Sequence, residues 1–158
     1  MGTRADYFIG EGESAEWLGS TAWDGYPEGV AESILKATTE EEFRAAVSAE
    51  LTSRDDGTVP ENGWPWPWDD SRTTDYAYMF VDGKVWASYF GRPLFDPLPD
   101  VLPTLKDPNS SMEETMRTAY TEQWWGAYDH LPKISFPDMK DKKNIALDGR
   151  SGLIILSA

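Results

Sequence analysis

The chain has 158 residues, with 28 carboxylate side chains against 14 lysines and arginines, and a net charge of −14. Its length and its 40% of hydrophobic residues predict a single domain, residues 1–158, with a sizeable core of its own. The absence of cysteine excludes disulfides, thiolate metal sites and cysteine nucleophiles.

The N-terminal part of the chain predicts a β-hairpin. Residues 3–10 and residues 15–22 have the composition of strands, and the glycine-containing stretch at residues 10–14 supplies a turn between them. The two strands are therefore expected to pair in antiparallel fashion.

Two helices are expected next. Pro27 suits the first turn of a helix that runs to about Ala37. Thr39 and Glu42 form a capping box that opens a second helix. The apolar residues of this second helix recur at helical spacing and predict a buried stripe: Phe43, Ala46, Val47 and Leu51.

Three tryptophans, Trp64, Trp66 and Trp68, alternate with two prolines. Proline fixes φ and makes the preceding residue extended, so the segment is stiff. Consecutive side chains of an extended chain point to opposite sides, so the three indoles, at every second position, are expected to lean one way. They either form a roof over the core or present an aromatic surface to a partner, and the residues leave both open.

A second hairpin is the clearest element of the chain. Residues 75–81 and 84–90 are β-rich and flank Asp82-Gly83, a two-residue turn of the type I′ kind. A proline-rich connection follows at residues 91–110.

The C-terminal part predicts one helix and two short strands. The helix is capped by Ser110 or Ser111 and ends near Gly126, and the strands cover residues 144–147 and 153–157. The expected fold class is α+β: an antiparallel sheet built from hairpins, with about three helices packed on it.

Catalytic and metal-site signatures are weak. His130 is the only histidine, its neighbour Asp129 is badly placed to orient it, and no Gly-x-Ser-x-Gly elbow is present. The acidic pairs Asp55-Asp56 and Asp69-Asp70 do not match a complete calcium loop. No phosphate-binding glycine motif occurs. We therefore assign no catalytic residue, no metal ligand and no cofactor.

Several motifs carry a resemblance. Thr3-Arg4-Ala5 is followed by Trp23-Asp24-Gly25-Tyr26-Pro27, and later by Gly63-Trp64-Pro65-Trp66-Pro67-Trp68, the 75–90 hairpin and Arg150-Ser151-Gly152-Leu153. The chain thereby resembles a widespread group of small bacteriophage and mobile-element proteins, which begin Met-Ser/Gly-Thr-Arg and show Trp-Asp-Gly-Tyr-Pro before a helix. The resemblance implies a phage or integrated-element setting and defines neither an activity nor catalytic residues.

The charge is unevenly distributed along the chain. Residues 133–158 carry a net charge of +2, and the rest of the chain carries −16. The acidic part of the chain, outside residues 133–158, is therefore expected to repel nucleic-acid phosphate and anionic lipid and to attract basic surfaces. No apolar run approaches the length of a membrane helix, and no secretory signal is present. We expect no direct binding to nucleic acid or membrane, and a location in the cytoplasm of a bacterial host.

The leading hypothesis is a non-enzymatic protein that binds a host protein with a basic surface. By analogy with small acidic proteins of such elements, it is an anti-CRISPR-like inhibitor of a nucleic-acid-binding defence complex. The rival hypothesis is a small hydrolase or ligand-binding module with a tryptophan-lined acidic cleft that uses Asp24, Asp69 or Asp70. The candidate binding residues are Asp24, Glu28, Glu32, Trp64, Trp66, Trp68, Asp69 and Asp70.

Overall fold

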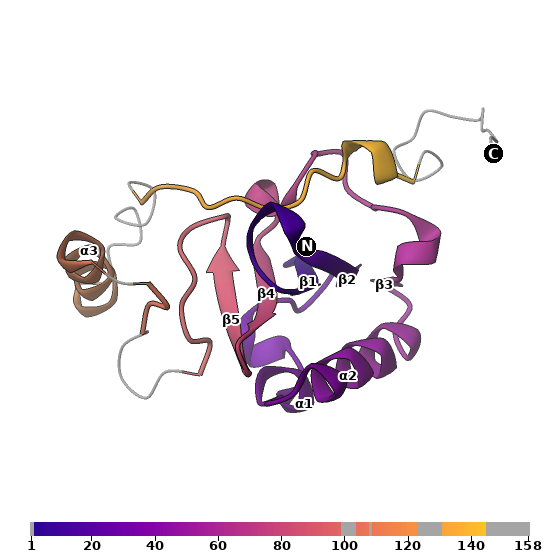
Figure 1. Ribbon diagram of the computed structural model, residues 1–158, viewed down its shortest axis with the longest axis horizontal. Helices are drawn as coiled ribbons and strands as arrows, with labels where there is room; N and C mark the ends of the chain where they lie inside the picture. The colour runs from indigo at the N-terminus through magenta and orange to yellow at the C-terminus, as the bar shows by residue number, and fades with distance from the viewer. Residues whose placement is uncertain (1, 99–103, 108, 123–130, 145–158) are drawn as a thin grey trace.

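The computed structural model describes residues 2–98, 104–107, 109–122 and 131–144. Its centre is a five-stranded sheet with the strand order β3-β2-β1-β4-β5 (Figure 1). The strands are β1 (Ala5–Ile9), β2 (Glu16–Thr21), β3 (Gly57–Thr58), β4 (Tyr76–Val81) and β5 (Lys84–Tyr89). The helices are α1 (Glu32–Leu35), α2 (Glu40–Thr52) and α3 (Ser110–Thr121), and none of them is long and apolar enough to cross a membrane.

The sheet is mixed, so the expectation of a purely antiparallel sheet is wrong in one respect. The two predicted hairpins form, with β1 antiparallel to β2 and β4 antiparallel to β5. The central pair β1 and β4 is parallel, with Tyr7 opposite Tyr78. The long connection between the hairpins carries the chain back across the sheet, so that β4 starts at the same end as β1. The α+β class itself is confirmed.

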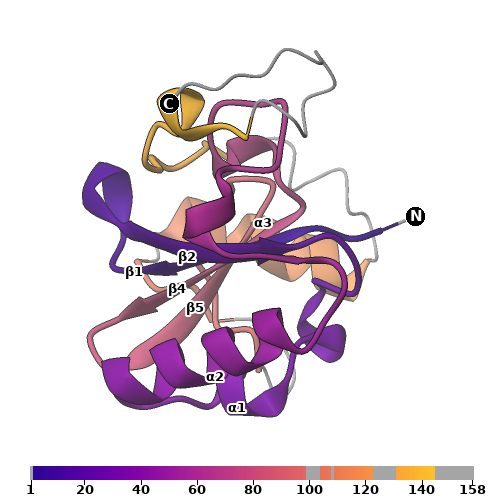
Figure 2. The same ribbon diagram turned by 90° about the vertical axis from the view of Figure 1, so that its right-hand side faces the viewer.

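Helices α1 and α2 cover one face of the sheet (Figure 2). The helical spacing in α2 places Phe43, Val47 and Leu51 in the core, as predicted, while Ala46 is half-buried. The predicted cap is present, because the Thr39 hydroxyl oxygen accepts a hydrogen bond from the Glu42 N–H at 3.1 Å. The start and the buried face of α2 were therefore both readable from the sequence.

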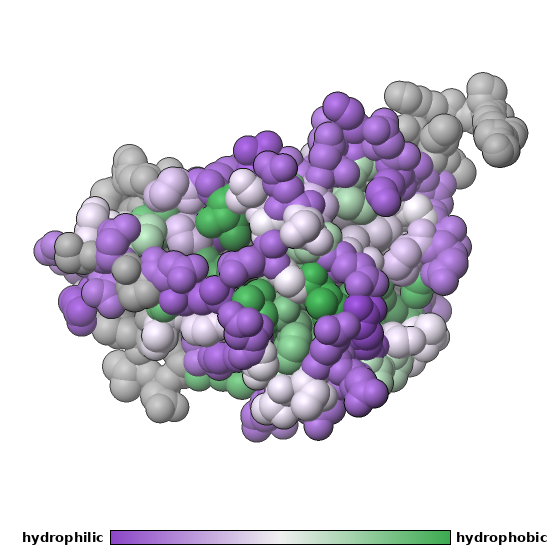
Figure 3. Space-filling model, viewed as in Figure 1, coloured by the Kyte–Doolittle hydropathy of each residue, from purple (hydrophilic) through white to green (hydrophobic). Residues whose placement is uncertain are grey.

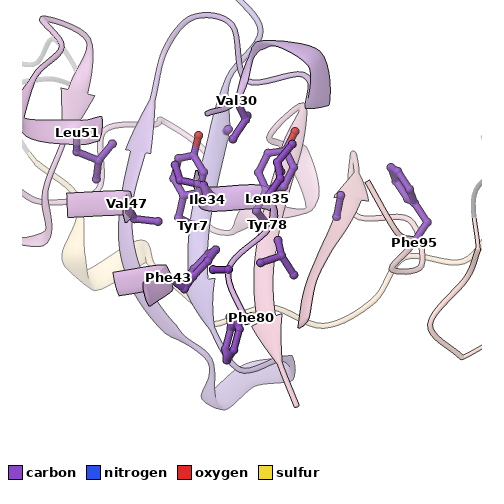
Figure 4. Close-up of a cluster of buried hydrophobic side chains, with 14 of the residues drawn as sticks. Tyr7, Val30, Ile34, Leu35, Phe43, Val47, Leu51, Tyr78, Phe80 and Phe95 are labelled. Carbon is purple, nitrogen blue, oxygen red and sulfur yellow. The ribbon is translucent and has the colours of Figure 1, made fainter. Parts of the chain in front are cut away.

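One aromatic pair joins this helix layer to the sheet, and a second pair joins the neighbouring strands β1 and β4 (Figure 4). The rings of Phe43 and Phe80 stack with centroids 5.6 Å apart, and those of Tyr7 and Tyr78 stack at the same distance. The buried cluster on this face contains Ala5, Tyr7, Val30, Ile34, Leu35, Ala37, Phe43, Val47, Leu51, Tyr78, Phe80, Val85, Ala87, Phe95, Leu105 and Leu131.

The opposite face of the sheet has no α-helix among the described residues. It is covered by the Trp–Pro segment, residues 64–68, and by the C-terminal strap, residues 131–144 (Figure 2). Two backbone hydrogen bonds join them: Trp64 N–H donates to the Lys142 carbonyl at 2.7 Å, and Asn144 N–H donates to the Trp64 carbonyl at 2.8 Å. The buried cluster here contains Phe8, Ala15, Trp17, Trp64, Trp66, Ala77, Met79, Val81, Leu94, Phe136 and Met139.

The remaining predictions have mixed outcomes. Asp82 and Gly83 both have positive φ, 51° and 83°, as a type I′ turn requires. Helix α3 is capped by neither Ser110 nor Ser111, because the Asn109 side chain accepts from the Met112 N–H at 2.9 Å and the helix begins at Ser110. It lies beyond β5 rather than on a face of the sheet, so two helices and not three form the covering layer (Figure 1). The predicted helix end near Gly126 is wrong, because α3 ends at Thr121 with Glu122 as its C-cap. The two predicted C-terminal strands lie outside the described residues apart from position 144.

Candidate functional site

The structure separates the predicted site residues into two groups on opposite faces of the sheet. Asp24, Glu28 and Glu32 belong to the segment that leads into α1, and this segment packs with the helix-side core. The second group is residues 64–70, on the side of the Trp–Pro segment. One cleft therefore does not contain both Asp24 and the Asp69-Asp70 pair.

The Trp–Pro segment is a roof over the core, which decides between the two alternatives left open by its sequence. Trp64 is fully buried, Trp66 is 9% exposed and Trp68 is half-buried. The Trp64 indole N–H donates to the Trp68 carbonyl at 2.7 Å, and its ring meets that of Trp17 edge-on at 5.3 Å. Because Trp64 and Trp66 face inward, they do not supply the walls of an open cleft or a surface for a partner.

A fully buried carboxylate, Asp6, lies beneath this roof. It accepts hydrogen bonds from the Ser20 hydroxyl at 2.6 Å, the Trp66 indole N–H at 2.7 Å and the Ser71 hydroxyl at 2.7 Å. Burial raises the pKa of Asp6, and the hydrogen bonds from Ser20, Thr74, Trp66 and Ser71 oppose that rise. All three donors are neutral. Ser20 lies in strand β2 and Trp66 in the Trp–Pro segment, so Asp6 holds the roof to the sheet.

Arg4 lies at the edge of the same roof. Its guanidinium carbon is 5.6 Å from the centre of the Trp66 ring and 5.4 Å from that of Trp68, and the two indoles stack at 5.6 Å. The acid that pairs with Arg4 is Asp75, at 3.7 Å.

Asp69 and Asp70 border a surface hollow of about 540 Å³ together with Glu13, Arg72, Ser135, Phe136, Asp138 and Lys140. Both aspartates already have cationic partners: Asp69 pairs with Lys143 at 2.9 Å and Asp70 with Arg72 at 3.0 Å. No group of three or more metal-ligating side chains gathers among the described residues. Among the carboxylates that border the hollow, Asp69, Asp70 and Asp138 are therefore in ion pairs, and Glu13 is in none of the ion pairs of the described residues.

The tryptophan turn, residues 23–26, presents a different surface. Trp23 is 53% exposed and Tyr26 is 38% exposed, which makes them two of the three large hydrophobic side chains exposed in the described part of the chain. Asp24 has a φ of 58°, a left-handed conformation that Asp adopts more readily than most residues. An exposed indole next to an unusual backbone conformation is a feature of binding turns.

A set of hydrogen bonds makes this turn rigid. The Asp56 carboxylate accepts from the N–H groups of Ala22 at 3.0 Å and Trp23 at 2.8 Å, while Arg54 donates to the Trp23 carbonyl at 2.8 Å. On the other side, Gly25 N–H donates to the Thr3 carbonyl at 2.8 Å. The backbone that carries the Trp23 indole is therefore held at a fixed place on the surface.

Gly25 is required for the turn to sit this close to the sheet. A Cβ atom at this position would lie 2.7 Å from the Ala5 Cβ and 2.8 Å from the Thr3 carbonyl oxygen. The Tyr78 hydroxyl donates to the Gly25 carbonyl at 2.6 Å, and burial raises the pKa of Tyr78, so this donor keeps its proton. The turn is thus anchored to strand β4.

The pair Arg54 and Asp56 remains charged over the physiological range. Burial acts to raise the pKa of Asp56, but the Arg54 hydrogen bond, the Trp23 and Ala22 N–H donors and the charge of Arg54 together hold it below its usual value. Arg54 contacts Asp56 at 2.6 Å and Glu50 at 3.1 Å. The clamp that holds Trp23 is therefore an ion pair inside an acid-rich region.

Carboxylates without cationic partners flank the tryptophan turn. In the described ranges, neither Asp24 nor Glu28 forms an ion pair, while Glu32 makes a long contact of 3.7 Å with Lys36. The backbone next to Glu28 lies close to that of Asp24, because a Cβ atom at Gly29 would touch the Asp24 carbonyl oxygen. The turn thus combines exposed aromatic surface with unneutralised negative charge.

Sequence reasoning identified Asp24 and Glu28 but missed Trp23, Tyr26 and Asp6. The signal for Asp6 was a carboxylate inside a β-rich run, residues 3–10. Trp23 offered no comparable signal, because its exposure depends on the clamp formed by residues 54 and 56 far along the chain. His130, whose role the sequence left open, lies outside the described residues.

Comparisons with known proteins add no function to this geometry. No family model, no curated protein and no solved structure matches the chain. The likeness to phage and mobile-element proteins remains one of sequence motifs. The function is therefore argued from the charge and the exposed side chains of the chain itself.

Proposed function

We propose that this protein is a binding protein that holds a basic surface of another protein on its acid-rich, helix-covered side. The observation that carries the proposal is the charge of residues 24–56, which contain nine carboxylates and only three bases. The carboxylates are Asp24, Glu28, Glu32, Glu40, Glu41, Glu42, Glu50, Asp55 and Asp56.

The three bases of this region are already engaged within the chain. Lys36 pairs with Glu32, Arg44 with Glu16 and Glu40, and Arg54 with Glu50 and Asp56. The surplus negative charge is therefore available to a partner. By contrast, the C-terminal strap on the opposite face has four lysines against two aspartates. The strap lysines lower the negative charge of the opposite face, which also carries Asp69 and Asp70, and this inequality between the two sides favours one orientation of docking.

The character of the surface agrees with binding dominated by charge. In Figure 3 most of the visible surface is hydrophilic, and its hydrophobic side chains form separate small areas. Large continuous apolar patches mark obligate interfaces, whereas charged surfaces give fast, salt-sensitive association. A partner recruited by this surface carries a matching positive charge.

The partner class that fits best is a nucleic-acid-handling host protein. Such proteins carry lysine- and arginine-rich surfaces that bind phosphate, and an acidic protein competes for the same surface. Together with the motif likeness to phage proteins, this supports the role of an inhibitor of a host defence complex, of the anti-CRISPR kind. Stoichiometric binding without turnover accounts for the features described.

The rival, a hydrolase or ligand module with a tryptophan-lined cleft, has no favouring observation. Two of its three indoles, Trp64 and Trp66, are buried, and its carboxylates lie on opposite faces of the sheet or are paired with cations. The hollow beside Asp69 and Asp70 has no feature that distinguishes a ligand site from an ordinary surface depression.

The test is affinity capture from a bacterial lysate at low and high salt, with two charge-reversal variants. Replacing Glu28 and Glu32 by Lys is expected to weaken capture of a nucleic-acid-handling protein by about tenfold, since each reversal opposes the partner's charge. The matched control replaces Asp138 and Asp141 of the strap by Lys, with the same change in net charge. Equal effects of the two variants, or capture of no basic protein at low salt, would refute the proposal.

A further inference from the structure

Trp23 combines exposure with a fixed position. One edge of its indole rests against Gly2, where a Cβ atom would lie 2.7 Å from the Trp23 Cδ1. Its backbone is clamped through both N–H and carbonyl groups by Asp56 and Arg54. Rigid aromatic side chains lose little conformational entropy on binding and are enriched among binding hot spots. Trp23 therefore offers a prearranged contact to a partner.

Elsewhere in the chain, an arginine lies over indole rings and pairs with a carboxylate. Trp23 has the indole and a neighbouring carboxylate but, among the described residues, not the cation. At the roof, the Arg4 guanidinium lies over the Trp66 and Trp68 rings and pairs with Asp75. The tryptophan turn holds the indole and the Asp24 carboxylate, and Glu28 follows two residues after the turn. In the part of the chain that the structure describes, no cation lies over the Trp23 ring. The missing member of this second arrangement is a cation.

We propose that Trp23 is a stacking platform for an arginine side chain of the partner, with Asp24 and Glu28 as the paired carboxylates. The inference deepens the proposed function and depends on it. Arginine fits better than lysine, because its planar guanidinium stacks on an indole face while its fork of N–H donors remains able to pair with a carboxylate. Tyr26 extends the aromatic surface beside it.

Three short peptides test the chemistry without knowledge of the partner. One alternates arginine with glycine, the second has lysine in place of arginine, and the third has the uncharged isostere citrulline. The readouts are the dissociation constant and the shift of the Trp23 indole N–H resonance. We expect the arginine peptide to bind about threefold or more tightly than the lysine peptide and to shift the Trp23 resonance. The citrulline peptide is expected not to bind.

Variants show whether the indole is responsible. Trp23→Ala is expected to weaken binding of the arginine peptide by about fivefold to tenfold and to remove the preference over lysine, while Trp23→Phe retains part of both. The control is Trp86→Phe, because the Trp86 ring is already covered by Lys84 at 5.3 Å. This control should leave binding unchanged.

The outcomes separate the inference from the proposed function. If both cationic peptides bind equally and Trp23→Ala has no effect, the stacking platform is refuted while the acidic surface stands. If neither cationic peptide binds the wild-type protein, both are refuted. Preference for arginine that is lost in Trp23→Ala and kept in Trp86→Phe supports the platform.

Discussion

The two faces of the sheet are covered in different ways. On the helix side, α1 and α2 contribute apolar side chains from regular elements, and the contacts are stacked rings and aliphatic groups (Figure 4). On the roof side, the Trp–Pro segment and the strap have little regular structure, and indole N–H groups make specific hydrogen bonds. The first face is stabilised mainly by burial of apolar area, and the second also by polar geometry.

This difference has consequences for how each face tolerates change. Apolar burial is non-directional and depends on volume, so a substitution costs in proportion to the cavity it leaves. A buried polar network depends on each partner, because a donor left without an acceptor costs its full desolvation. Substitutions on the two faces should therefore differ in size and in their dependence on pH.

The largest effect is expected on the helix side from Phe43→Ala. The Phe43 ring is fully buried and stacks on Phe80, so its loss leaves a cavity between α2 and the sheet. We expect a decrease of about 4 kcal/mol in the free energy of unfolding. Urea unfolding monitored by circular dichroism measures it.

Ala45→Ser on the exposed side of the same helix is the matched control. It should change the free energy of unfolding by less than about 0.5 kcal/mol. A small effect of Phe43→Ala would show that the helix layer is not packed on the sheet as described.

The same contrast explains what the sequence predicted. Helical spacing predicted the buried side of α2, and Asp82-Gly83 predicted the β4–β5 turn, because both signals are local. The parallel pairing of β1 with β4 was missed, since neither strand carries information about which distant strand lies beside it. The two-residue strand β3 was missed for a related reason: it lies in a stretch with loop composition and exists only by pairing with β2.

The candidate site was predicted only in part. Asp24 and Glu28 were identified because they belong to the acidic part of the chain, which was expected to attract a basic surface. The three tryptophans of the Trp–Pro segment were considered for binding because their spacing aligns the rings, but the spacing does not say whether the core or solvent lies on that side. Trp23 was missed because its exposure follows from a clamp made by Arg54 and Asp56, some thirty positions away.

The second prediction concerns the roof side. Asp6→Ala removes the acceptor of Trp66, Ser20 and Ser71, all within the core. We expect a loss of about 3 kcal/mol in the free energy of unfolding, because several buried donors lose their partner. This loss is reduced, but not cancelled, because the cost of burying the carboxylate disappears. Tryptophan fluorescence during urea unfolding reports both the loss and any loosening of the indoles.

Asp69→Ala is the control on the same side, because this carboxylate is largely exposed and its pairing with Lys143 is a surface one. It should cost less than about 1 kcal/mol. If Asp6→Ala costs no more than this control, Asp6 does not hold the roof to the sheet.

The smallest and most specific effect is the pH dependence of Asp6→Asn. The amide keeps one acceptor oxygen and the shape of the side chain, so the loss in acid should be about 1 kcal/mol. Because the pKa of Asp6 is raised on folding, the folded wild-type protein binds this proton more tightly than the unfolded chain does. The resulting stabilisation is complete below the unfolded pKa of about 3.9 and is lost as the pH rises through the folded pKa.

Asn has no proton to lose, so the stability difference between wild type and Asp6→Asn should narrow as the pH rises. Other groups, including Asp56 with its lowered pKa, lose stability in acid in both proteins and cancel from the difference. Urea unfolding of both proteins at several values between about pH 4 and about pH 8 measures the trend. A difference that stays constant or widens with pH would contradict a buried carboxylate that gains its proton on folding. The same comparison for Phe43→Ala should be flat, because no titrating group touches that cavity.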